Sequence, residues 1–371
     1  MGAPSFSRVV VTGDLLRPFF VGARVESATW KNVRWLHGML EAPLRASGLT
    51  ARMLAWDERG APETTAFFDT PSLYDALGLD LDLASWAALC ADGRTPQALV
   101  EMLAPQVEDA LVIGYELPPP LIAALERLGR PVVDLILHPV RFMPDLIFAL
   151  RTNVPAWDAW LRARRLDEAA IAERAGHIRA KAAWMAAPMP LPPGTALVLG
   201  QVASDRAMIQ ADGGFASLER HCAFLHELCC RHPRVLFRPH PYAAPDDPCE
   251  RAIARLPAIR RTDANFYHLL AQPELTTVVA LNSSGLIEAR HFGRESINLM
   301  PWLYDFDACA PAADGRTGTP VPLSSAWATA AFWRGLLQDD AQASPAPLPD
   351  HTLRRAMNAD WGYGFIERIC A

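Results

Sequence analysis

The stretch that decides the fold is "VVALNSSGLIEARHFGRESINLM", residues 278–300. It contains an apolar run, two serines and a glycine, a short segment with helical spacing, and a second apolar run. A continuous apolar run of this kind indicates a strand buried on both faces, as in a parallel sheet covered by helices. The stretch therefore predicts a strand, a helix and a second strand, with Ser283 and Ser284 at the turn where the helix begins.

The same alternation of apolar runs and amphipathic stretches extends through the whole chain. The predicted helices include 31–47 and 118–128. The predicted strands cover 8–14, 110–116, 131–139, 195–201, 234–241, 276–284 and 295–300. This pattern predicts an α/β fold with parallel sheets covered on both faces.

A proline-rich stretch, "AAPMPLPPGT" (186–195), lies between the two halves of the chain. Because proline cannot continue a helix, this stretch is typical of an interdomain linker. We therefore expect two Rossmann-like domains, over 1–187 and 188–345, whose sheets face a central cleft. The last residues, 351–371, have helical spacing with large aromatic side chains.

Polar and charged side chains recur where the predicted strands end. In α/β sheets, ligands bind at the carboxyl ends of the strands, where loops and helix amino ends converge. This repeated position predicts a site in the cleft. Its candidate residues are Asp14, Arg17, Glu116, His138, Arg141, Gln201, Asp205, His240, Ser283 and Ser284.

Composition excludes several classes of function. The chain has 371 residues, 51% of them hydrophobic and 20% charged, and a formal net charge of −6. Nucleic-acid binding draws on clustered Lys and Arg, so we expect no nucleic-acid partner. No run approaches 18 apolar residues and the start lacks the apolar region of a leader, which predicts a cytoplasmic protein. The seven cysteines contain no CxxC pair and predict neither a disulfide framework nor a zinc site.

Two serines at one helix start can serve two purposes. One hydroxyl caps the helix, and a second can add a donor to a phosphate held by the helix amino end. Capping and turn geometry alone would also account for both serines. The stretch "FRPHP" (237–241), with Arg238 and His240 at another strand end, favours the phosphate site.

Together, "RPHP" and "NSSGLIEA" with its following "FG" resemble the His-Pro and Ser-Ser motifs of GT-B glycosyltransferases that use CMP-activated acidic sugars. The segments "GQVASDRAMI" (200–209), "TGDLLRP", "GYELPPPL" and "HPVRFMPD" extend the resemblance through most of the chain. The set is similar to the retaining β-Kdo transferases of bacterial O-antigen and capsule assembly, and most similar to the O-antigen type.

The resemblance implies a GT-B fold and a CMP-β-Kdo donor, with no cofactor and no catalytic metal. It implies an acceptor-side domain over 1–187, a CMP-sugar domain over 188–345, and a terminal helix over 346–371 that returns to the first domain. The acceptor would be a glycan, expected to be lipid-linked in lipopolysaccharide or capsule polysaccharide synthesis. Peripheral association with the inner face of the inner membrane, or with other glycan-assembly enzymes, belongs to the same expectation.

Retention by double displacement needs a carboxylate that attacks the anomeric carbon and later leaves. Asp205, four residues after Gln201, matches the nucleophilic aspartate of the family, and Gln201 is assigned to the donor site with it. A helix cap before "RAMI" is the alternative for Asp205. Glu116 is the candidate acid or base for the acceptor hydroxyl, and a carboxylate in the first turn of a helix is its alternative.

The acidic donor sugar carries its own carboxylate, which needs a cation. Arg17, Arg141 and Arg238 are candidates for this role, and each can instead form an ordinary ion pair. His138 and Asp14 are placed with Arg17 and Arg141 on the sugar-carboxylate or acceptor side, while Arg238 is assigned to the donor site.

Glu288, one turn after Ser284, is a candidate acceptor for the ribose hydroxyls. Pairing with Arg290 or Arg294 is its alternative.

Two other functions stay open from the sequence. One is transfer of a different CMP-sugar, as in a sialyltransferase-like enzyme, and the other is glycan or nucleotide binding without turnover. The sequence does not identify the acceptor sugar, the linkage position, the oligomeric state or the arginine that pairs with the sugar carboxylate. Nor does it show whether the chain is a domain of a longer polymerase.

Overall fold

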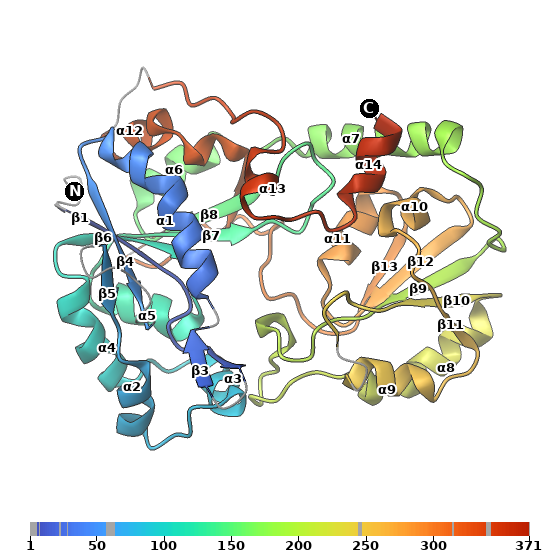
Figure 1. Ribbon diagram of the computed structural model, residues 1–371, viewed down its shortest axis with the longest axis horizontal. Coiled ribbons are helices and arrows are strands. Elements are labelled where there is room, and N and C mark those ends of the chain that lie inside the picture. Colours follow the sequence, from blue (N-terminus) through green and yellow to red (C-terminus); the bar gives the residue numbers. More distant parts are fainter. Residues whose placement is uncertain are drawn as a thin grey trace.

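A computed structural model describes residues 6, 8–21, 24–27, 29–56, 64–243, 247–313, 315–338 and 343–370. Within them the chain forms two mainly parallel sheets that lie side by side, each with helices on both faces (Figure 1). The predicted α/β architecture with two parallel sheets is therefore confirmed. All seven predicted strands are present, each shorter than predicted because its last residues belong to the following loop.

The first sheet has seven strands. From β5 through β4, β1 and β6 to β7 its neighbours pair in parallel, and β8 and β14 add an antiparallel edge. The strand order is β14 (Val321–Leu323), β8 (Phe148–Thr152), β7 (Val132–Leu137), β6 (Ala110–Tyr115), β1 (Arg8–Thr12), β4 (Thr50–Ala55) and β5 (Thr65–Phe67).

The second sheet has five strands, and all its neighbours are parallel. Its order is β11 (Ile259–Arg261), β10 (Val235–Arg238), β9 (Thr195–Leu199), β12 (Leu275–Ala280) and β13 (Glu295–Asn298). A separate antiparallel hairpin joins β2 (Pro18–Val21) to β3 (Arg24–Ser27).

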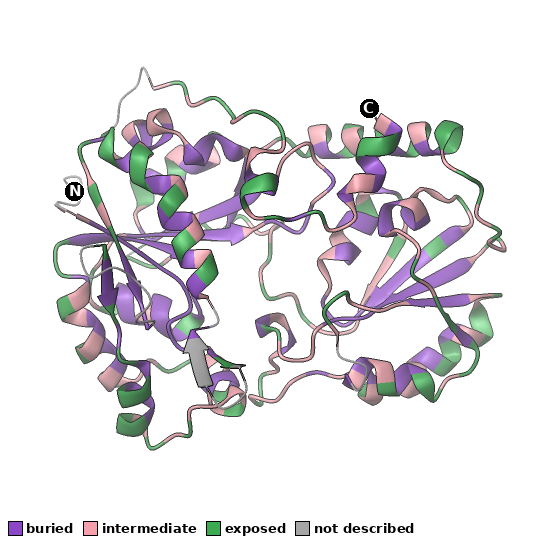
Figure 2. Ribbon diagram, in the orientation of Figure 1, coloured by how far each residue is buried: buried purple, intermediate pink, exposed green. Residues whose placement is uncertain are grey.

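Alternate residues of each strand enter different cores, as the two-residue period of a strand requires. In β1, Val9 and Val11 pack on one face with α1 (Trp30–Arg45), whereas Val10 packs on the other with α5 (Pro119–Arg127). In β9, Leu197 and Ala196 divide in the same way between two cores. Both sheets are accordingly buried between helices whose outer faces are exposed (Figure 2).

The helices that cover the sheets begin and end as follows. Around the first sheet lie α1 (Trp30–Arg45), α2 (Thr70–Leu77), α3 (Leu83–Ala91), α4 (Gln97–Leu103), α5 (Pro119–Arg127), α6 (Pro155–Arg162) and α12 (Ala330–Gln338). Around the second lie α7 (Glu168–Met185), α8 (Cys222–Arg231), α9 (Pro248–Ala254), α10 (Phe266–Ala271), α11 (Ser284–His291) and α14 (Tyr363–Cys370). Short 3-10 turns cover Ala104–Gln106, Arg206–Met208, Leu218–His221 and Ser325–Ala328.

The chain passes between the sheets at a place that differs from the predicted linker. Helix α7 precedes the proline-rich stretch, yet its apolar face, including Ile171 and Ile178, packs in a core of the second sheet. The crossing is therefore the short segment 163–167 between α6 and α7, and residues 186–194 only join α7 to β9. The prolines end α7 without separating two domains.

The chain also returns to the first sheet earlier than predicted. Strand β14 pairs with β8, and Phe332 and Trp333 of α12 lie in a core of the first sheet, although both elements fall within 188–345. Leu353 of α13 (Thr352–Ala356) joins the same core. Helix α14 instead packs against α7 and α10 of the second sheet, so the prediction that the terminal helix returns to the first domain is wrong for α14.

Candidate functional site

The predicted site residues follow neighbouring strands in both sheets. Asp14, Glu116 and His138 come after β1, β6 and β7, which are adjacent in the first sheet. Gln201 and His240 come after β9 and β10, and Ser283 follows β12, the other neighbour of β9. Because adjacent parallel strands end at the same edge, each sheet contributes a row of loops at its carboxyl edge.

Gln201 and Asn282 tie together the loops that follow β9, β12 and β13. The Gln201 side-chain carbonyl accepts a hydrogen bond of 2.7 Å from the Asn282 backbone N–H. The Asn282 amide donates to the Ala207 carbonyl at 3.2 Å and to the Pro301 carbonyl at 2.7 Å. Gln201 is buried and serves as a loop tie, which fixes the segment that carries Asp205.

Asp205 caps the 3-10 turn Arg206–Met208. Its carboxylate accepts a hydrogen bond of 2.9 Å from the Ala207 N–H, so the capping interpretation is confirmed. The side chain is nevertheless exposed, which leaves its second carboxylate oxygen accessible. Capping and reaction with a ligand are therefore compatible at this residue.

Arg206 connects the two sheets and was not among the predicted residues. Its buried guanidinium donates to the Glu116 backbone carbonyl and to the Tyr304 hydroxyl. A second contact runs alongside, because the Arg17 guanidinium donates to the Ser204 carbonyl at 2.9 Å. These bonds place the loop of Asp205 against the loops that follow β1 and β6.

Glu116 lies directly after β6 with a positive φ of 48°, a backbone conformation that non-glycine residues rarely adopt. It lies before α5, which begins at Pro119, so the alternative of a first-turn helix carboxylate is wrong. Its Oε1 accepts from the Leu137 N–H at 3.2 Å. Burial raises the pKa of Glu116, the Arg206 charge opposes that rise, and the negative charge of Asp205 adds to it.

His240 lies beside the loop of Gln201 and Asp205. Its Nδ1 accepts a hydrogen bond of 3.1 Å from the Tyr242 N–H. A neutral ring therefore carries its proton on Nε2, where it can be donated to a ligand. Burial lowers the pKa of His240, with Asp205 opposing the change and Arg141 and Arg238 reinforcing it. The ring is therefore a neutral N–H donor near pH 7.

Gly200 explains how the loops of β9 and β10 approach so closely. A Cβ at Gly200 would lie 3.0 Å from the His240 backbone nitrogen, tighter than nearly all real contacts. At the end of β10, the Arg238 backbone carbonyl accepts a hydrogen bond of 2.9 Å from the Gly200 N–H. The Arg238 side chain donates its Nε–H to the Ala264 carbonyl at 3.1 Å. Its guanidinium thus helps to hold the loop after β11.

The two serines have different positions at the start of α11. The Ser283 hydroxyl accepts from the Gly285 N–H at 3.2 Å and is the cap, while Ser284 is the first helical residue. Gly285 is needed there because a Cβ would lie 2.7 Å from Leu199 of β9. The pair therefore divides into a capping serine and a serine on the first turn, next to the end of β9.

Asp14 and Arg17 form a buried group with Trp86 of α3. The Asp14 carboxylate accepts from the Leu16 N–H at 2.9 Å and from the Trp86 indole N–H at 3.0 Å. Burial raises the pKa of Asp14 against the opposing charges of Arg206 and Arg17. The Arg17 guanidinium lies 4.8 Å from the Trp86 ring centre. These contacts shape the loop after β1.

Glu288 and Arg141 meet between the two sheets. Glu288 is buried, and its Oε1 accepts from the Arg141 backbone N–H and the Tyr267 hydroxyl, both at 2.8 Å. Its observed partners are neither Arg290 nor Arg294, so that alternative is wrong, and the ribose role stays a prediction. Burial raises the pKa of Glu288 to about 7, opposed by its hydrogen bond to Arg141.

The Arg141 side chain has a different environment from its backbone. Its guanidinium carbon lies 4.1 Å from the ring centre of Trp361, near the C-terminus. Its Nε is buried without a hydrogen-bond partner among the described residues. The planar cation is therefore held by ring stacking, with donor capacity left over.

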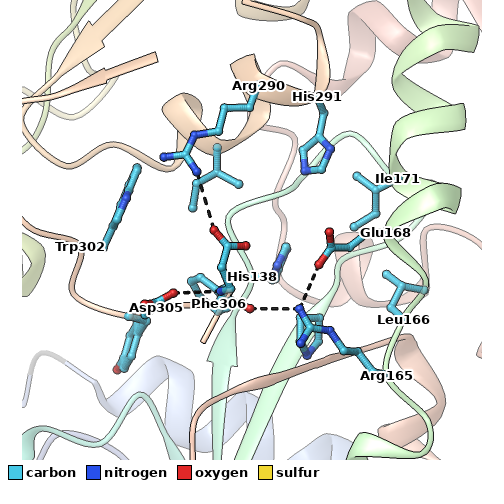
Figure 3. Close-up of a pocket in the computed structure, with 14 residues that line it drawn as sticks. His138, Arg165, Leu166, Glu168, Ile171, Arg290, His291, Trp302, Asp305 and Phe306 are labelled. Carbon is cyan, nitrogen blue, oxygen red and sulfur yellow. Dashed lines mark hydrogen bonds and ion pairs between the residues drawn. The ribbon is translucent and has the colours of Figure 1, made fainter. Parts of the chain in front are cut away.

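A cavity of about 230 Å³ lies next to these residues, between α7, α11 and the loop after β13 (Figure 3). His138 lines it from the first sheet, while Trp302 and Phe306 line it from the loop. Arg165 and Glu168 line it from the start of α7 and the segment before it. This cavity was not predicted, because its walls come from five separate segments of the chain, between residues 138 and 322.

The described part of the chain contains neither a metal-binding cluster nor a membrane-spanning helix. Its residues contain no cluster of three or more His, Cys, Asp or Glu side chains arranged to hold a metal ion. Of the helices described, none is both long enough and apolar enough to cross a membrane. The seven cysteines are all free thiols, as predicted.

No protein-family model and no curated protein matches this sequence. Among solved structures, the chain is similar to KpsC β-Kdo 2,4 transferase from Thermosulfurimonas dismutans, with a TM-score of 0.37 and 12% identity over 77% of this chain and 78% of that one. The KpsC β-Kdo 2,7 transferase of the same organism is also similar, with a TM-score of 0.35 and 17% identity over 57% of this chain and 72% of that one.

A UDP-GlcNAc 2-epimerase from Methanocaldococcus jannaschii is also similar, with a TM-score of 0.29 and 8% identity over 98% of this chain and 99% of that one. At these identities and TM-scores, the similarities concern the arrangement of the two α/β sheets and say nothing about activity.

Proposed function

We propose that this chain is a retaining GT-B glycosyltransferase that moves β-Kdo from CMP-β-Kdo to a glycan acceptor in O-antigen or capsule assembly. The observation that carries the proposal is the juxtaposition of two carboxylates from two sheets. Arg206 bonds the backbone of Glu116, and the residue before Arg206 is the exposed Asp205, whose charge acts on the pKa of Glu116. A nucleophile and a proton-transfer group need this proximity.

In the first step, an Asp205 oxygen attacks the anomeric carbon of Kdo, and the bond from that carbon to the phosphate oxygen breaks. CMP leaves with the electron pair, and Kdo is held as an ester on Asp205. Because Asp205 is exposed at the end of a fixed loop, it is accessible to a donor in the cleft. Attack from the face opposite the phosphate inverts the anomeric configuration once.

In the second step, the acceptor hydroxyl oxygen attacks the same carbon and the bond to Asp205 breaks. Glu116 receives the hydroxyl proton, so Asp205 returns to its carboxylate form. A carboxyl group with a raised pKa is a stronger base for this transfer than an ordinary one. The second inversion restores the original configuration, which gives net retention.

The donor phosphate is assigned to His240, Ser283 and Ser284. The neutral His240 ring offers its Nε2–H, and Ser284 adds a hydroxyl at the first turn of α11. Backbone N–H groups and the positive end of the α11 dipole favour an anion at the same place. These uncharged donors would stabilise a single phosphate by hydrogen bonding, without a divalent cation.

Arg141 is the arginine best suited to the Kdo carboxylate. Arg17 and Arg238 each donate to a backbone carbonyl, at 2.9 Å and 3.1 Å. The Arg141 guanidinium is oriented by Trp361 and keeps a buried Nε without a partner among the described residues. Since Arg141 also acts on the pKa of His240, the cation lies within electrostatic range of the proposed phosphate site.

The donor can be tested by incubating the protein with CMP-Kdo and, in parallel, with CMP-sialic acid, and by following CMP release with and without glycan acceptors. The proposal expects CMP release from CMP-Kdo. Faster release from CMP-sialic acid would favour a sialyltransferase-like enzyme, and saturable CMP binding without release from either donor would favour a binding protein. A cytoplasmic location and a lipid-linked acceptor belong to the same proposal.

A further inference from the structure

The cavity beside the proposed reaction site is lined by two arginines and three carboxylates. Arg165 pairs with Glu168 at 3.0 Å, and Arg290 lies 3.8 Å from Asp307. The third carboxylate of the lining is Asp305, which accepts from two backbone N–H groups of its own loop. Two arginines against three carboxylates leave one net negative charge, which disfavours an anionic ligand.

The two histidines of the lining do not change this balance. Burial lowers the pKa of His138 to about 3, and burial also lowers the pKa of His291. Both rings are therefore neutral near pH 7. The His138 Nδ1 accepts from the Val140 N–H at 3.2 Å, so its proton is on Nε2 and the ring is a hydrogen-bond donor.

Aromatic surface completes the lining. Trp302, Tyr304 and Phe306 alternate along the loop after β13 and all line the cavity. Figure 3 shows the side chains of Trp302 and Phe306. The Arg290 guanidinium lies 5.7 Å from the Trp302 ring centre. Flat aromatic surface with a few donors and acceptors in fixed positions suits the C–H face and the hydroxyl groups of a sugar ring.

The proton-transfer carboxylate of Glu116 does not line the cavity but is connected to two of its lining residues, His138 and Tyr304. Leu137 donates its N–H to Glu116 Oε1 at 3.2 Å, and the next residue, His138, lines the cavity. From the other side, the Tyr304 hydroxyl accepts from Arg206, which also donates to the Glu116 carbonyl. The cavity and the proposed reaction site therefore share the loop after β7 and the bonds of Arg206.

We propose that this cavity binds a neutral pyranose ring of the glycan acceptor, rather than an acidic sugar. The identification of the bound sugar as part of the acceptor rests on the proposed function. The binding itself depends only on the cavity and is measured without any donor.

The test is binding of methyl pyranosides of glucose, galactose and mannose, each compared with the methyl glycoside of its uronic acid, by saturation-transfer NMR and calorimetry. At least one neutral sugar should bind about five-fold more tightly than its uronic acid, because the added carboxylate meets a net negative lining. Trp302→Ala should weaken that binding about ten-fold through loss of ring contact, and Trp302→Phe should restore most of it. Trp184→Ala, an exposed tryptophan on α7 that does not line the cavity, is the control.

Equal or tighter binding of the uronic acids, absence of binding by every neutral pyranoside, or an unchanged affinity in a folded Trp302→Ala protein would overturn the inference. Formation of a Kdo adduct from CMP-Kdo needs no acceptor, so it is measured independently of pyranoside binding. An adduct without pyranoside binding would refute the cavity and leave the function standing. Pyranoside binding without CMP release or adduct would refute the function and leave a sugar-binding cavity.

Discussion

Glu288 offers a prediction about stability that can be worked out from its contacts. The carboxyl is buried, with 3% of its surface exposed, and Oε1 accepts hydrogen bonds from the Arg141 N–H and the Tyr267 hydroxyl. Glu288→Gln keeps an oxygen that can accept both bonds but removes the ionisable group. The variant is therefore neutral at every pH, as the buried wild-type side chain is at low pH.

The pKa of Glu288 rises from 4.5 to about 7 on folding. Between these values the unfolded chain has lost the proton while the folded protein keeps it, so wild-type stability falls as pH rises through this window. A shift of about 2.5 units, at about 1.4 kcal/mol per unit, corresponds to about 3 kcal/mol. That amount is fully present below pH 4.5 and lost above pH 7.

The assay is urea unfolding of wild type and Glu288→Gln from pH 4.5 to pH 8, with the free energy of unfolding compared at each pH. The stability of the variant relative to wild type should rise by about 3 kcal/mol across this range. Comparison within one pH removes the contributions of all other titrating groups. Glu101→Gln makes the same chemical change on the exposed surface of α4 and is the control.

A stability difference that stays constant with pH would refute the reasoning, because it would mean that Glu288 ionises equally easily in both states. A difference that falls with rising pH would be a stronger contradiction, since it would mean that the folded protein favours the carboxylate.

Three further predictions concern the proposed reaction. His240→Ala should weaken CMP binding about ten-fold or more, through loss of a hydrogen-bond donor to a charged group. His226→Ala, on the exposed side of α8, is the control and should not weaken it. Equal CMP affinities of wild type and His240→Ala in calorimetry would remove His240 from the phosphate site. Arg141→Lys should raise KM for CMP-Kdo about ten-fold and leave the affinity for CMP alone unchanged, because CMP lacks the carboxylate and lysine lacks the planar fork; unaltered donor kinetics would exclude Arg141. EDTA should leave transfer unaffected, and activity lost with EDTA and recovered with magnesium or manganese would show that a metal takes part.

The sheets were predictable from the sequence because their central strands are continuous apolar runs. Runs such as 8–14 and 110–116 are buried on both faces, and this alone distinguishes them from amphipathic helices. Short edge strands carry a weaker signal. The three residues of β14 join the first sheet only through pairing with β8, about 170 residues earlier in the chain.

The assignment of helices to sheets was not predictable in the same way. An apolar face shows that a helix packs, but not which sheet it packs on. Helix α7 and helix α14 both cover the second sheet, whereas the position of α7 in the chain and its proline-rich end suggested the first domain. Long-range packing decides such cases.

The rows of strand-end residues were predictable, because topology alone places them at one edge. The contacts that join the two rows were not. Arg206 stands next to Asp205 in the sequence, which is a usable signal, but its bonds to Glu116 and Tyr304 join residues 90 and 98 positions apart. No local pattern around Tyr304 indicates that contact.

The measurement that tests the central claim most directly is the intact mass of the protein after incubation with CMP-Kdo and no acceptor, followed by peptide mapping. If Asp205 is the nucleophile, the protein gains the mass of one Kdo unit on the peptide that contains Asp205. Asp205→Asn should show no adduct and severely reduced transfer, with fold and CMP binding retained, because the amide keeps the shape of the side chain and its cap but loses the nucleophilic charge. A folded Asp205→Asn protein that transfers Kdo at near the wild-type rate would contradict the mechanism and leave Asp205 as a cap alone.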